Sequence, residues 1–292
     1  MKSLTVFTPS YNRAYLLPQL YSSLCNQSSQ DFIWLIVDDG STDNSQELIK
    51  GWMTEDKIQI QYVYQENQGM HGAHNAAYAN IKSEFNVCID SDDFMPDNAV
   101  EIILRECENL DEKYAGILGL DANKNGEIIG TGIPESLTAV KLNELYSLHK
   151  IKGDKKIVYR TEIVKKYPKY PLYEKERFVP LDYLYLLIDQ DYHLKPVNKI
   201  LCIVEYQADG SSMNIFKQYR NHPNGFAFSR VSRIKYAKTF EERFKNAIHL
   251  VSSSFFANKL SWLFKSDKPL LVFTAVPFGI LLNVYIRYKT KS

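Results

Sequence analysis

Glycine is missing from the segment where a phosphate-binding loop would be expected. The apolar run Leu4–Thr8 predicts a first strand, and the residues that follow it, Thr8–Arg13, contain no glycine. A dinucleotide-binding dehydrogenase carries Gly-x-Gly-x-x-Gly at this place, so the sequence disfavours that class. A nucleotidyltransferase would also have a glycine-rich loop with a basic residue here, and it stays only as an alternative interpretation.

Net charge is nearly absent, and cysteine is scarce. The 292 residues include 35 Lys and Arg against 34 Asp and Glu, which gives a net charge of +1. No global field draws such a chain to nucleic acid, and we expect no nucleic-acid partner. Widely spaced cysteines without a Cys-x-x-Cys pair indicate reduced, buried thiols in a reducing compartment. The four are Cys25, Cys88, Cys107 and Cys202.

A secretory signal is not predicted either. Only a short apolar run follows Lys2, and Pro9, Asn12 and Arg13 then interrupt it. Together with the cysteine pattern, this favours a cytoplasmic protein.

Short apolar runs alternate with helical patterns in the first 113 residues. Leu16, Leu20 and Leu24 recur at i+4, which places them on one helix face between two such runs. Alternation of this kind predicts right-handed βαβ units and a mostly parallel α/β sheet flanked by helices. The predicted strands are Leu4–Thr8, Phe32–Val37, Ile58–Tyr64 and Phe85–Ile89.

The pattern becomes mixed after Tyr114. Asn125-Gly126 predicts a hairpin turn between Gly116–Leu120 and Glu127–Ile129. We expect one α/β domain over residues 1–213, with halves 1–113 and 114–213, and a helical region over 214–292. The other predicted elements are helices near Thr138–Leu148 and Leu181–Asp189, and strands at Lys156–Arg160 and Ile200–Tyr206.

Two aspartate clusters follow two of the predicted strands. The first lies in Val37–Asp43 and the second in Ile89–Asp93. Ligands of open α/β sheets bind at the carboxyl ends of the strands, where both clusters would lie. Mg²⁺ or Mn²⁺ would offset the repulsion between the carboxylates and commonly bridges to substrate phosphates. Helix capping by the aspartates is the simpler alternative, but two clusters in matching contexts favour a metal and nucleotide site.

These motifs together resemble the family 2 glycosyltransferases of the GT-A fold. The resemblance covers roughly Leu4 to Ser212, and its later part is similar to bacterial members that build teichoic acid, capsule or other surface glycans. The motifs that carry it are Thr8–Arg13, Val37–Asp43, Asn67-Gln68-Gly69 with Ala73 and Asn75, Asp90–Asp93, Glu176–Pro180, Val204–Tyr206 and Asp209–Ser212.

The resemblance implies a metal-dependent inverting glycosyltransferase. It would move a sugar from a UDP-sugar, bound by the half 1–113, to a glycan or polyprenyl-linked glycan acceptor at the half 114–213. A non-catalytic carbohydrate-binding or scaffolding member of the fold is the other alternative. Asp93 is the first choice for the Mn²⁺ or Mg²⁺ ligand and Asp92 the second. The implied donor-binding residues are Pro9, Tyr11, Arg13, Asp39, Asn67, Gly69, Asn75, Asp90, Ser91 and Asp92.

Individual roles follow the same resemblance. Asp39 would hydrogen-bond the base, and Asn67 and Asn75 would order the neighbouring loop. Tyr11 would stack on the base or simply pack, and Arg13 would contact a phosphate or begin a helix in solvent.

A catalytic base is expected within Val179–Tyr183. Asp182 matches the basic aspartate of the family, whereas Leu181 stands where the family usually has a second acid. Glu174 and Glu176 are nearby alternatives. Asp182 could also be an ordinary first-turn residue favoured by the helix dipole.

One long apolar run lies near the C-terminus. Leu270–Ile286 is interrupted only by a few residues and is followed by Arg287, Lys289 and Lys291. Its seventeen residues are at the short limit for a membrane span. We therefore expect helices that lie on the inner face of the cell membrane, anchored by cations. A helix packed on the catalytic domain is the alternative.

Overall fold

The computed structural model describes residues 2–205 and 214–291, which form two compact units. The first contains the described residues up to Pro168 and those from Ile188 to Glu205. The second contains Lys169–Leu187 and the described residues from Asn214 onward. The C-terminal region is helical as predicted, but Lys169–Leu187 belongs with it, whereas the sequence placed this segment in the α/β domain.

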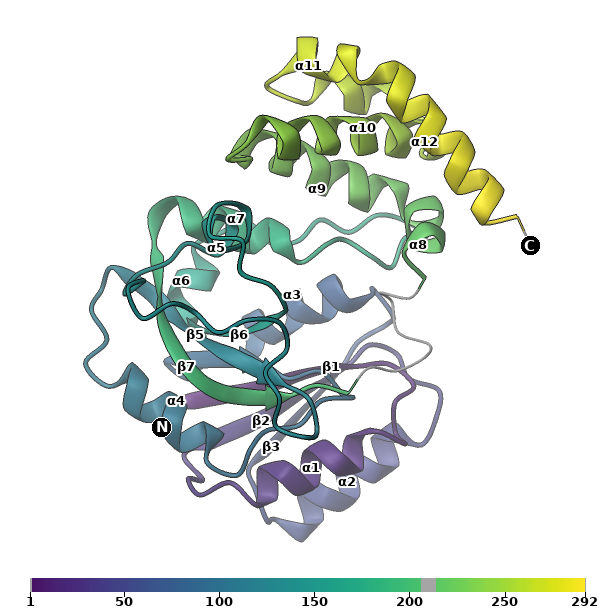
Figure 1. Ribbon diagram of the computed structural model, residues 1–292. Coiled ribbons are helices and arrows are strands. Elements are labelled where there is room, and N and C mark those ends of the chain that lie inside the picture. Colours follow the sequence, from purple (N-terminus) through teal and green to yellow (C-terminus); the bar gives the residue numbers. More distant parts are fainter. Residues whose placement is uncertain (1, 206–213, 292) are drawn as a thin grey trace. The chain divides into compact units, whose positions relative to one another are not determined.

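The first unit is built on a seven-stranded sheet in the order β3-β2-β1-β4-β6-β5-β7 (Figure 1). β1 runs parallel to β2 and β4, β2 is parallel to β3, and β5 is parallel to β7. Only β6 is antiparallel to its neighbours, β4 and β5. The mostly parallel α/β sheet is therefore confirmed. Its strands are β1 Leu4–Ser10, β2 Phe32–Asp38, β3 Ile60–Tyr64, β4 Phe85–Cys88, β5 Tyr114–Ala122, β6 Lys155–Arg160 and β7 His193–Ile203.

Helices cover both faces of this sheet because side chains alternate along each strand. On one face Trp34 and Ile36 of β2 pack with α1 (Leu17–Cys25), α2 (Ser45–Glu55) and α4 (Ala99–Cys107). On the other face, Leu35 and Val37 pack with Ala73, Ala77 and Ile81, which belong to or follow α3 (Met70–Asn80). Trp52 of α2 stacks on Tyr21 of α1 at 4.3 Å between ring centroids, and Figure 1 shows these two helices side by side. Two short helices, α5 (Leu142–Ser147) and α6 (Thr161–Lys165), complete the unit.

Two predictions in the later half differ from the structure. The turn at Asn125-Gly126 is present, but its second arm is reduced to one bridge, between Ala122 and Ile128. β7 begins at His193, earlier than the predicted Ile200. It is the last strand of the sheet order, and an edge strand tolerates the polar residues and the proline, Pro196, that hid it from the sequence pattern.

The second unit is helical. α7 (Asp182–Asp191) begins in it and ends in the first unit. A core of Ile234, Leu250, Val251, Trp262 and Val272 joins the C-terminal helices. These are α8 Ile215–Asn221, α9 Pro223–Tyr236, α10 Phe240–Phe256, a 3-10 helix Leu260–Phe264, α11 Pro269–Thr274 and α12 Val276–Lys289.

The predicted apolar run forms α11 and α12, which pack on α10 within this unit. Gly279 of α12 lies so close to α10 that a Cβ there would be 2.4 Å from the Cβ of Val251. Asn283 donates from Nδ2 to the carbonyl of Ser252 at 3.0 Å. Among the described helices, none is long and apolar enough to cross a membrane.

Candidate active site

The two aspartate clusters lie at one edge of the sheet, as the sequence predicted. β1 lies between β2 and β4, and all three strands end at this edge. The amide of Asp39 donates to the carbonyl of Ser10 at 2.8 Å, and the amide of Ile89 donates to that of Phe7 at 3.0 Å. The chain order reverses between β1 and β4, which is where open α/β sheets bind their ligands.

The loop after β1 is tied to the loop after β2. Asn12, at a φ of 54°, accepts at Oδ1 from the amide of Thr42 at 2.7 Å. Its own amide donates to the Ser41 hydroxyl at 2.9 Å. This arrangement leaves Tyr11 48% exposed, and Arg13 donates from Nη1 to the Tyr15 hydroxyl at 2.8 Å. Tyr11 and Arg13 therefore stand at the sheet edge, as predicted.

Asp39 orders a third loop, which the sequence did not reveal. Its buried carboxylate accepts the Gln68 and Gly69 amides at 2.8 and 2.7 Å, and the Gln65 side-chain amide at 2.6 Å. Gly40 has a φ of +84°, and a Cβ there would be 2.9 Å from the amide nitrogen of Asn67. The loop after β2 thus holds the loop after β3 through the Asp39 carboxylate and the loop after β1 through Asn12.

Asn67 is the described residue of this loop whose side chain best fits a ligand contact. Its Oδ1 is buried without a hydrogen-bond partner. Such an orphaned acceptor is costly unless a ligand or water donates to it. Gly69, which the sequence grouped with it, holds the start of α3 at a φ of 80°. Asn75 is half-buried on α3, and Pro9 is buried in β1 opposite Val37.

The second cluster has two accessible carboxylates and one inward carboxylate. Asp90 and Asp92 are half-buried, whereas Ser91 and Asp93 are buried. Asp93 accepts at Oδ1 from the amide of Glu205 at 3.2 Å. Its Oδ2 lies 3.6 Å from the Cys202 thiol. The first-choice metal ligand of the sequence is thus already engaged by the chain.

Lys156 and Asp121 complete this cluster, and neither was expected from the sequence. Lys156 Nζ lies 3.9 Å from Asp93 Oδ2, and its side chain is only 13% exposed. Asp121 is buried, with no hydrogen-bond partner at Oδ1. Asp121 is the charged residue of an otherwise apolar strand, β5, and this pattern could have revealed it. Lys156 lies beside Lys155 in β6, where the sequence gives no such signal.

Burial sets the proton affinities of this cluster. It raises the pKa of Asp93 to about 7, against the opposing effect of Lys156. It also raises the pKa of Asp121. Burial by itself lowers the pKa of Lys156, but the neighbouring anionic groups, Asp121 and Asp93 among them, raise it well above its usual value. Lys156 is therefore a permanent cation beside the acidic cluster.

The donor chemistry of the cluster fits a hard divalent cation. Asp90, Ser91 and Asp92 offer oxygen ligands, which Mg²⁺ and Mn²⁺ prefer. Over the described residues, no three His, Cys, Asp or Glu side chains form a ready metal cage. Mg²⁺ is commonly held by only one or two carboxylates together with substrate phosphates, so the accessible Asp90 and Asp92 suffice for such a site.

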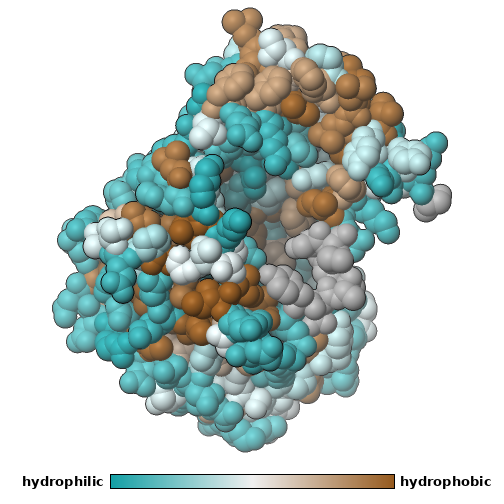
Figure 2. Space-filling view, in the orientation of Figure 1, coloured by the Kyte–Doolittle hydropathy of each residue, from teal (hydrophilic) through white to brown (hydrophobic). Residues whose placement is uncertain are grey.

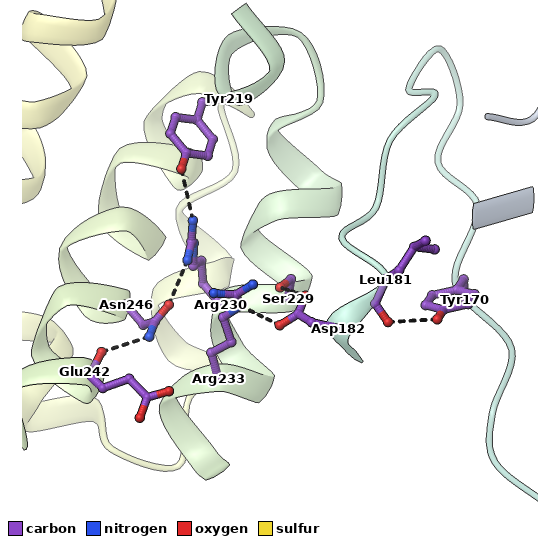
Figure 3. A network of polar contacts seen from close by, with 9 residues as sticks. All are labelled: Tyr170, Leu181, Asp182, Tyr219, Ser229, Arg230, Arg233, Glu242 and Asn246. Carbon is purple, nitrogen blue, oxygen red and sulfur yellow. Dashed lines mark hydrogen bonds and ion pairs between the residues drawn. The ribbon is translucent and has the colours of Figure 1, made fainter. Parts of the chain in front are cut away.

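Asp182 begins α7 in the second unit and is held by α9 (Figure 3). Its Oδ2 lies 2.6 Å from Nε of Arg233, in an ion pair whose N–H does not point along the contact. Its Oδ1 accepts from the Ser229 hydroxyl at 3.4 Å. The preceding carbonyl, of Leu181, accepts from the Tyr170 hydroxyl at 2.8 Å. The predicted base is therefore a held but accessible carboxylate, with a side chain that is 28% exposed.

Glu176, an alternative base, has a different task. Its buried carboxylate accepts at Oε1 from the amide of Asn224 at 3.0 Å and at Oε2 from the amide of Gly225 at 2.9 Å. It thus caps the N-terminus of α9, where anions are favoured. Glu174 is exposed. The motif residues Asp209–Ser212 lie outside the described residues.

The chain belongs to glycosyl transferase family 2, whose family model matches residues 5–167, more than half of the sequence. The GT-A architecture expected from the sequence is confirmed in the sheet.

Several curated proteins are similar to this chain. The glycosyltransferase GlyG of Streptococcus pneumoniae is 31% identical over 109 residues, which cover 37% of this chain and 36% of GlyG. A Campylobacter jejuni protein named GalNAc(5)-diNAcBac-PP-undecaprenol beta-1,3-glucosyltransferase is 27% identical over 140 residues, which cover 46% of this chain and 44% of that protein. The match to GlyG, like that to the Campylobacter protein, spans less than half of the relative's length.

Solved structures share the fold over nearly the whole chain. TarS of Staphylococcus aureus in complex with UDP-GlcNAc has a TM-score of 0.60 at 17% identity, covering 98% of this chain and 91% of the TarS chain. The mannosyltransferase PcManGT of Pyrobaculum calidifontis, in complex with GDP-Man and Mn²⁺, has a TM-score of 0.57 at 16% identity, covering 99% and 88%. Identities this low support the fold alone.

Proposed function

We propose that this protein is an inverting glycosyltransferase that transfers a sugar from a UDP-sugar to a hydroxyl of a glycan acceptor. The observation that carries the proposal is the sheet edge, where three interlocked loops and an orphaned acceptor, Asn67 Oδ1, lie beside an acidic cluster. This arrangement suits a nucleoside diphosphate, which has hydrogen-bond donors on its base and a concentrated negative charge on its phosphates.

The loops divide the recognition of the donor. Asn67 accepts from the base, and the exposed ring of Tyr11 stacks on it. Asp39 acts on the base side by fixing the Asn67-Gln68-Gly69 loop, and Asn75 supports that loop from α3. Arg13 faces the diphosphate, because guanidinium groups pair with phosphate oxygens.

The acidic cluster serves the diphosphate end. Asp92, with Asp90 or Asp93 beside it, would hold Mn²⁺ or Mg²⁺, and Ser91 contributes its hydroxyl. When bound, the cation offsets the negative charge that the departing diphosphate gains. Lys156 holds the Asp93 carboxylate in the protein interior. The more accessible carboxylates of Asp90 and Asp92 then face the ligand.

Asp182 is the proposed base. It accepts the proton of the attacking acceptor hydroxyl while that oxygen forms its bond to the anomeric carbon and the bond to UDP breaks. Attack opposite the leaving group inverts the configuration. Glu176 is not suited to this role, because its carboxylate already accepts the α9 amides.

The acceptor proposed here is a surface glycan, carried on a polyprenyl diphosphate at the inner face of the cell membrane. The name of the Campylobacter relative supports a lipid-linked acceptor. The protein's own support is its exposed apolar side chains, ten of which lie among residues 260–288. Figure 2 shows hydrophobic residues gathered on the surface of the C-terminal helices. Residues 259–291 also carry six Lys or Arg against one Asp, a net charge of +5 in a chain of net +1. Such a surface suits an anionic bilayer.

Donor binding tests the proposal first. UDP-glucose, UDP-galactose, UDP-GlcNAc and UDP-GalNAc, each with Mn²⁺, are compared by thermal unfolding. One of them at a hundredfold over its Kd is expected to stabilise the protein by about 2.7 kcal/mol. Asn67→Ala should weaken binding, whereas Asn109→Ala, remote in sequence and outside the loops, should not. If no UDP-sugar stabilises the protein, or if it releases pyrophosphate from nucleoside triphosphates, the proposal is wrong.

Flotation with liposomes tests the membrane surface. Full-length protein should float with vesicles that contain phosphatidylglycerol and less with phosphatidylcholine alone, and salt should weaken the binding. Leu281→Ser with Val284→Ser, both exposed on α12, should reduce flotation without unfolding the protein. Equal flotation of the variant and the parent would contradict membrane contact through α12.

A further inference from the structure

We propose that Arg233 of α9 is a positioning residue that holds the Asp182 carboxylate in place for proton transfer. This inference rests on the proposed role of Asp182 as the base. It assigns part of the catalytic arrangement to the C-terminal helices, which the family model does not reach.

Two side chains of one helix face approach Asp182. Ser229 and Arg233 are four positions apart on α9, so they lie on the same helix face. Arg233 meets one carboxylate oxygen at 2.6 Å and Ser229 meets the other at 3.4 Å. Each oxygen of a carboxylate has two acceptor positions, so one on each oxygen stays available for the proton of a substrate.

Arg230 fixes the helix that carries this pair (Figure 3). It is buried, donates from Nη1 to Oδ1 of Asn246 at 2.8 Å, and lies over the ring of Tyr219 at 5.8 Å. Asn246 in turn donates to the carbonyl of Glu242 at 2.8 Å. α9 is therefore attached to α10 by a buried polar network directly behind Arg233.

Burial and the neighbouring Arg233 lower the pKa of Arg230 to about 10, so it remains charged at neutral pH. Arg233, which pairs with Asp182, thus has a second charged arginine, Arg230, about one turn away on the same helix. The exposed member, Arg233, is 36% exposed, and ion pairs with this much solvent access add little to stability. If Arg233 only stabilised the fold, its substitution would change the free energy of unfolding little and leave turnover unchanged. If it positions Asp182, its substitution lowers turnover.

The test compares substitutions at Arg233, at Lys235 and at Asp182. Arg233→Gln should lower turnover at least tenfold while leaving the Kd for the donor and the unfolding temperature close to those of the parent. Arg233→Lys should restore part of the loss, since an ammonium retains the charge without the guanidinium geometry. Lys235→Gln, at an exposed cation on the same helix, is the matched control and should change nothing.

Turnover is measured as UDP release from the four UDP-sugars in the presence of Mn²⁺, and donor Kd by calorimetry. Millimolar guanidinium should partly rescue Arg233→Ala but not Asp182→Asn, because only the former has lost a guanidinium. A purely structural arginine would show no such rescue.

The outcomes separate the two proposals. If Asp182→Asn keeps parental turnover, the base assignment is wrong. If Asp182→Asn loses turnover while Arg233→Gln behaves like Lys235→Gln, the base assignment stands and the positioning role of Arg233 is overturned. If Arg233→Gln does not fold, Arg233→Lys is used in its place, and its donor Kd is measured as well. The positioning role is overturned if the folded lysine variant has parental turnover and guanidinium does not rescue Arg233→Ala.

Discussion

The two units differ in the charged side chains that they bury. In the first unit the buried acids include Asp38, Asp39, Asp93 and Asp121, and backbone amides or Lys156 offset most of them. Among the described residues of the second unit, the buried charged side chains are Arg230 and Glu176, and side chains or a helix N-terminus offset them. In the proposed function, the first unit would receive the cation and the diphosphate, and the second would hold the catalytic carboxylate.

Lys156→Met should sharpen this comparison most. It leaves Asp93 and Asp121 buried without their cation, and removing one partner of a buried ion pair costs about 3–5 kcal/mol. Urea unfolding should show the loss, and hydrogen exchange should place it in β4–β7 and not in α9–α12. Lys152→Met, at an exposed lysine just before the same strand, is the control. Equal stability of the two variants would mean that the cluster does not depend on Lys156.

Asp92→Asn should come next. The loss of one electrostatic contact to the departing diphosphate typically costs on the order of 10²–10³ in rate. UDP release and Mn²⁺ binding are measured together, with Asp97→Asn, an exposed aspartate nearby, as the control. Asp93→Asn distinguishes the two candidate metal ligands, Asp92 and Asp93. If Asp93→Asn removes Mn²⁺ binding and Asp92→Asn does not, the metal ligand is Asp93.

Gly279→Val should affect only the second unit. The added side chain would meet Val251 and the carbonyl of Ile248, and overpacking of this kind typically costs about 1–3 kcal/mol. The contrasting change is Gly51→Ala in α2, where no atom lies within 4 Å of the added Cβ. Alanine is the better helix former, so that variant should be more stable by about 0.8–1.0 kcal/mol. Urea unfolding of both variants provides the measurement.

Acid should weaken the second unit through His249. Burial and the neighbouring Arg230 lower the pKa of His249 to about 3, whereas an unfolded chain has a histidine pKa of about 6.5. Between these values the unfolded state binds the extra proton, so this contribution is complete above about pH 6.5 and declines as the pH falls. The slope is at most about 1.4 kcal/mol per pH unit.

His249→Gln should therefore flatten the dependence of urea unfolding on pH between 6.5 and 4. His149→Gln, at an exposed histidine of the first unit, is the control. His222 has a pKa lowered by burial as well, so some dependence should remain in the His249 variant. A parental slope in that variant would show that His249 is not the group responsible.

The sequence predicted the sheet and its binding edge better than the contacts within it. β1, β2 and β4 are continuous apolar runs, so their strands and the carboxylates after them could be read from the pattern alone. β7 was found only in part, because an edge strand does not need alternation. The contacts that Asp39 and Glu176 make within the chain could not be predicted, because they depend on which amides the folded chain brings to each carboxylate. Arg233 was missed for the same reason, since its partner is on another helix.

The cap that Glu176 forms on α9 has a consequence for modularity. Phe178, close to it in sequence, stacks on Phe226, and Tyr173 contacts the ring of Trp262, so a mid-chain segment is built into the C-terminal helices. A fragment that begins at Asn214 would lack these partners and leave the first amides of α9 without their carboxylate. The helical unit is therefore not a terminal block that could be exchanged between relatives by a single junction. Chimeras should succeed only when Lys169–Leu187 and the C-terminal helices come from the same parent, which a panel of one-junction and two-junction hybrids would reveal in their soluble yield.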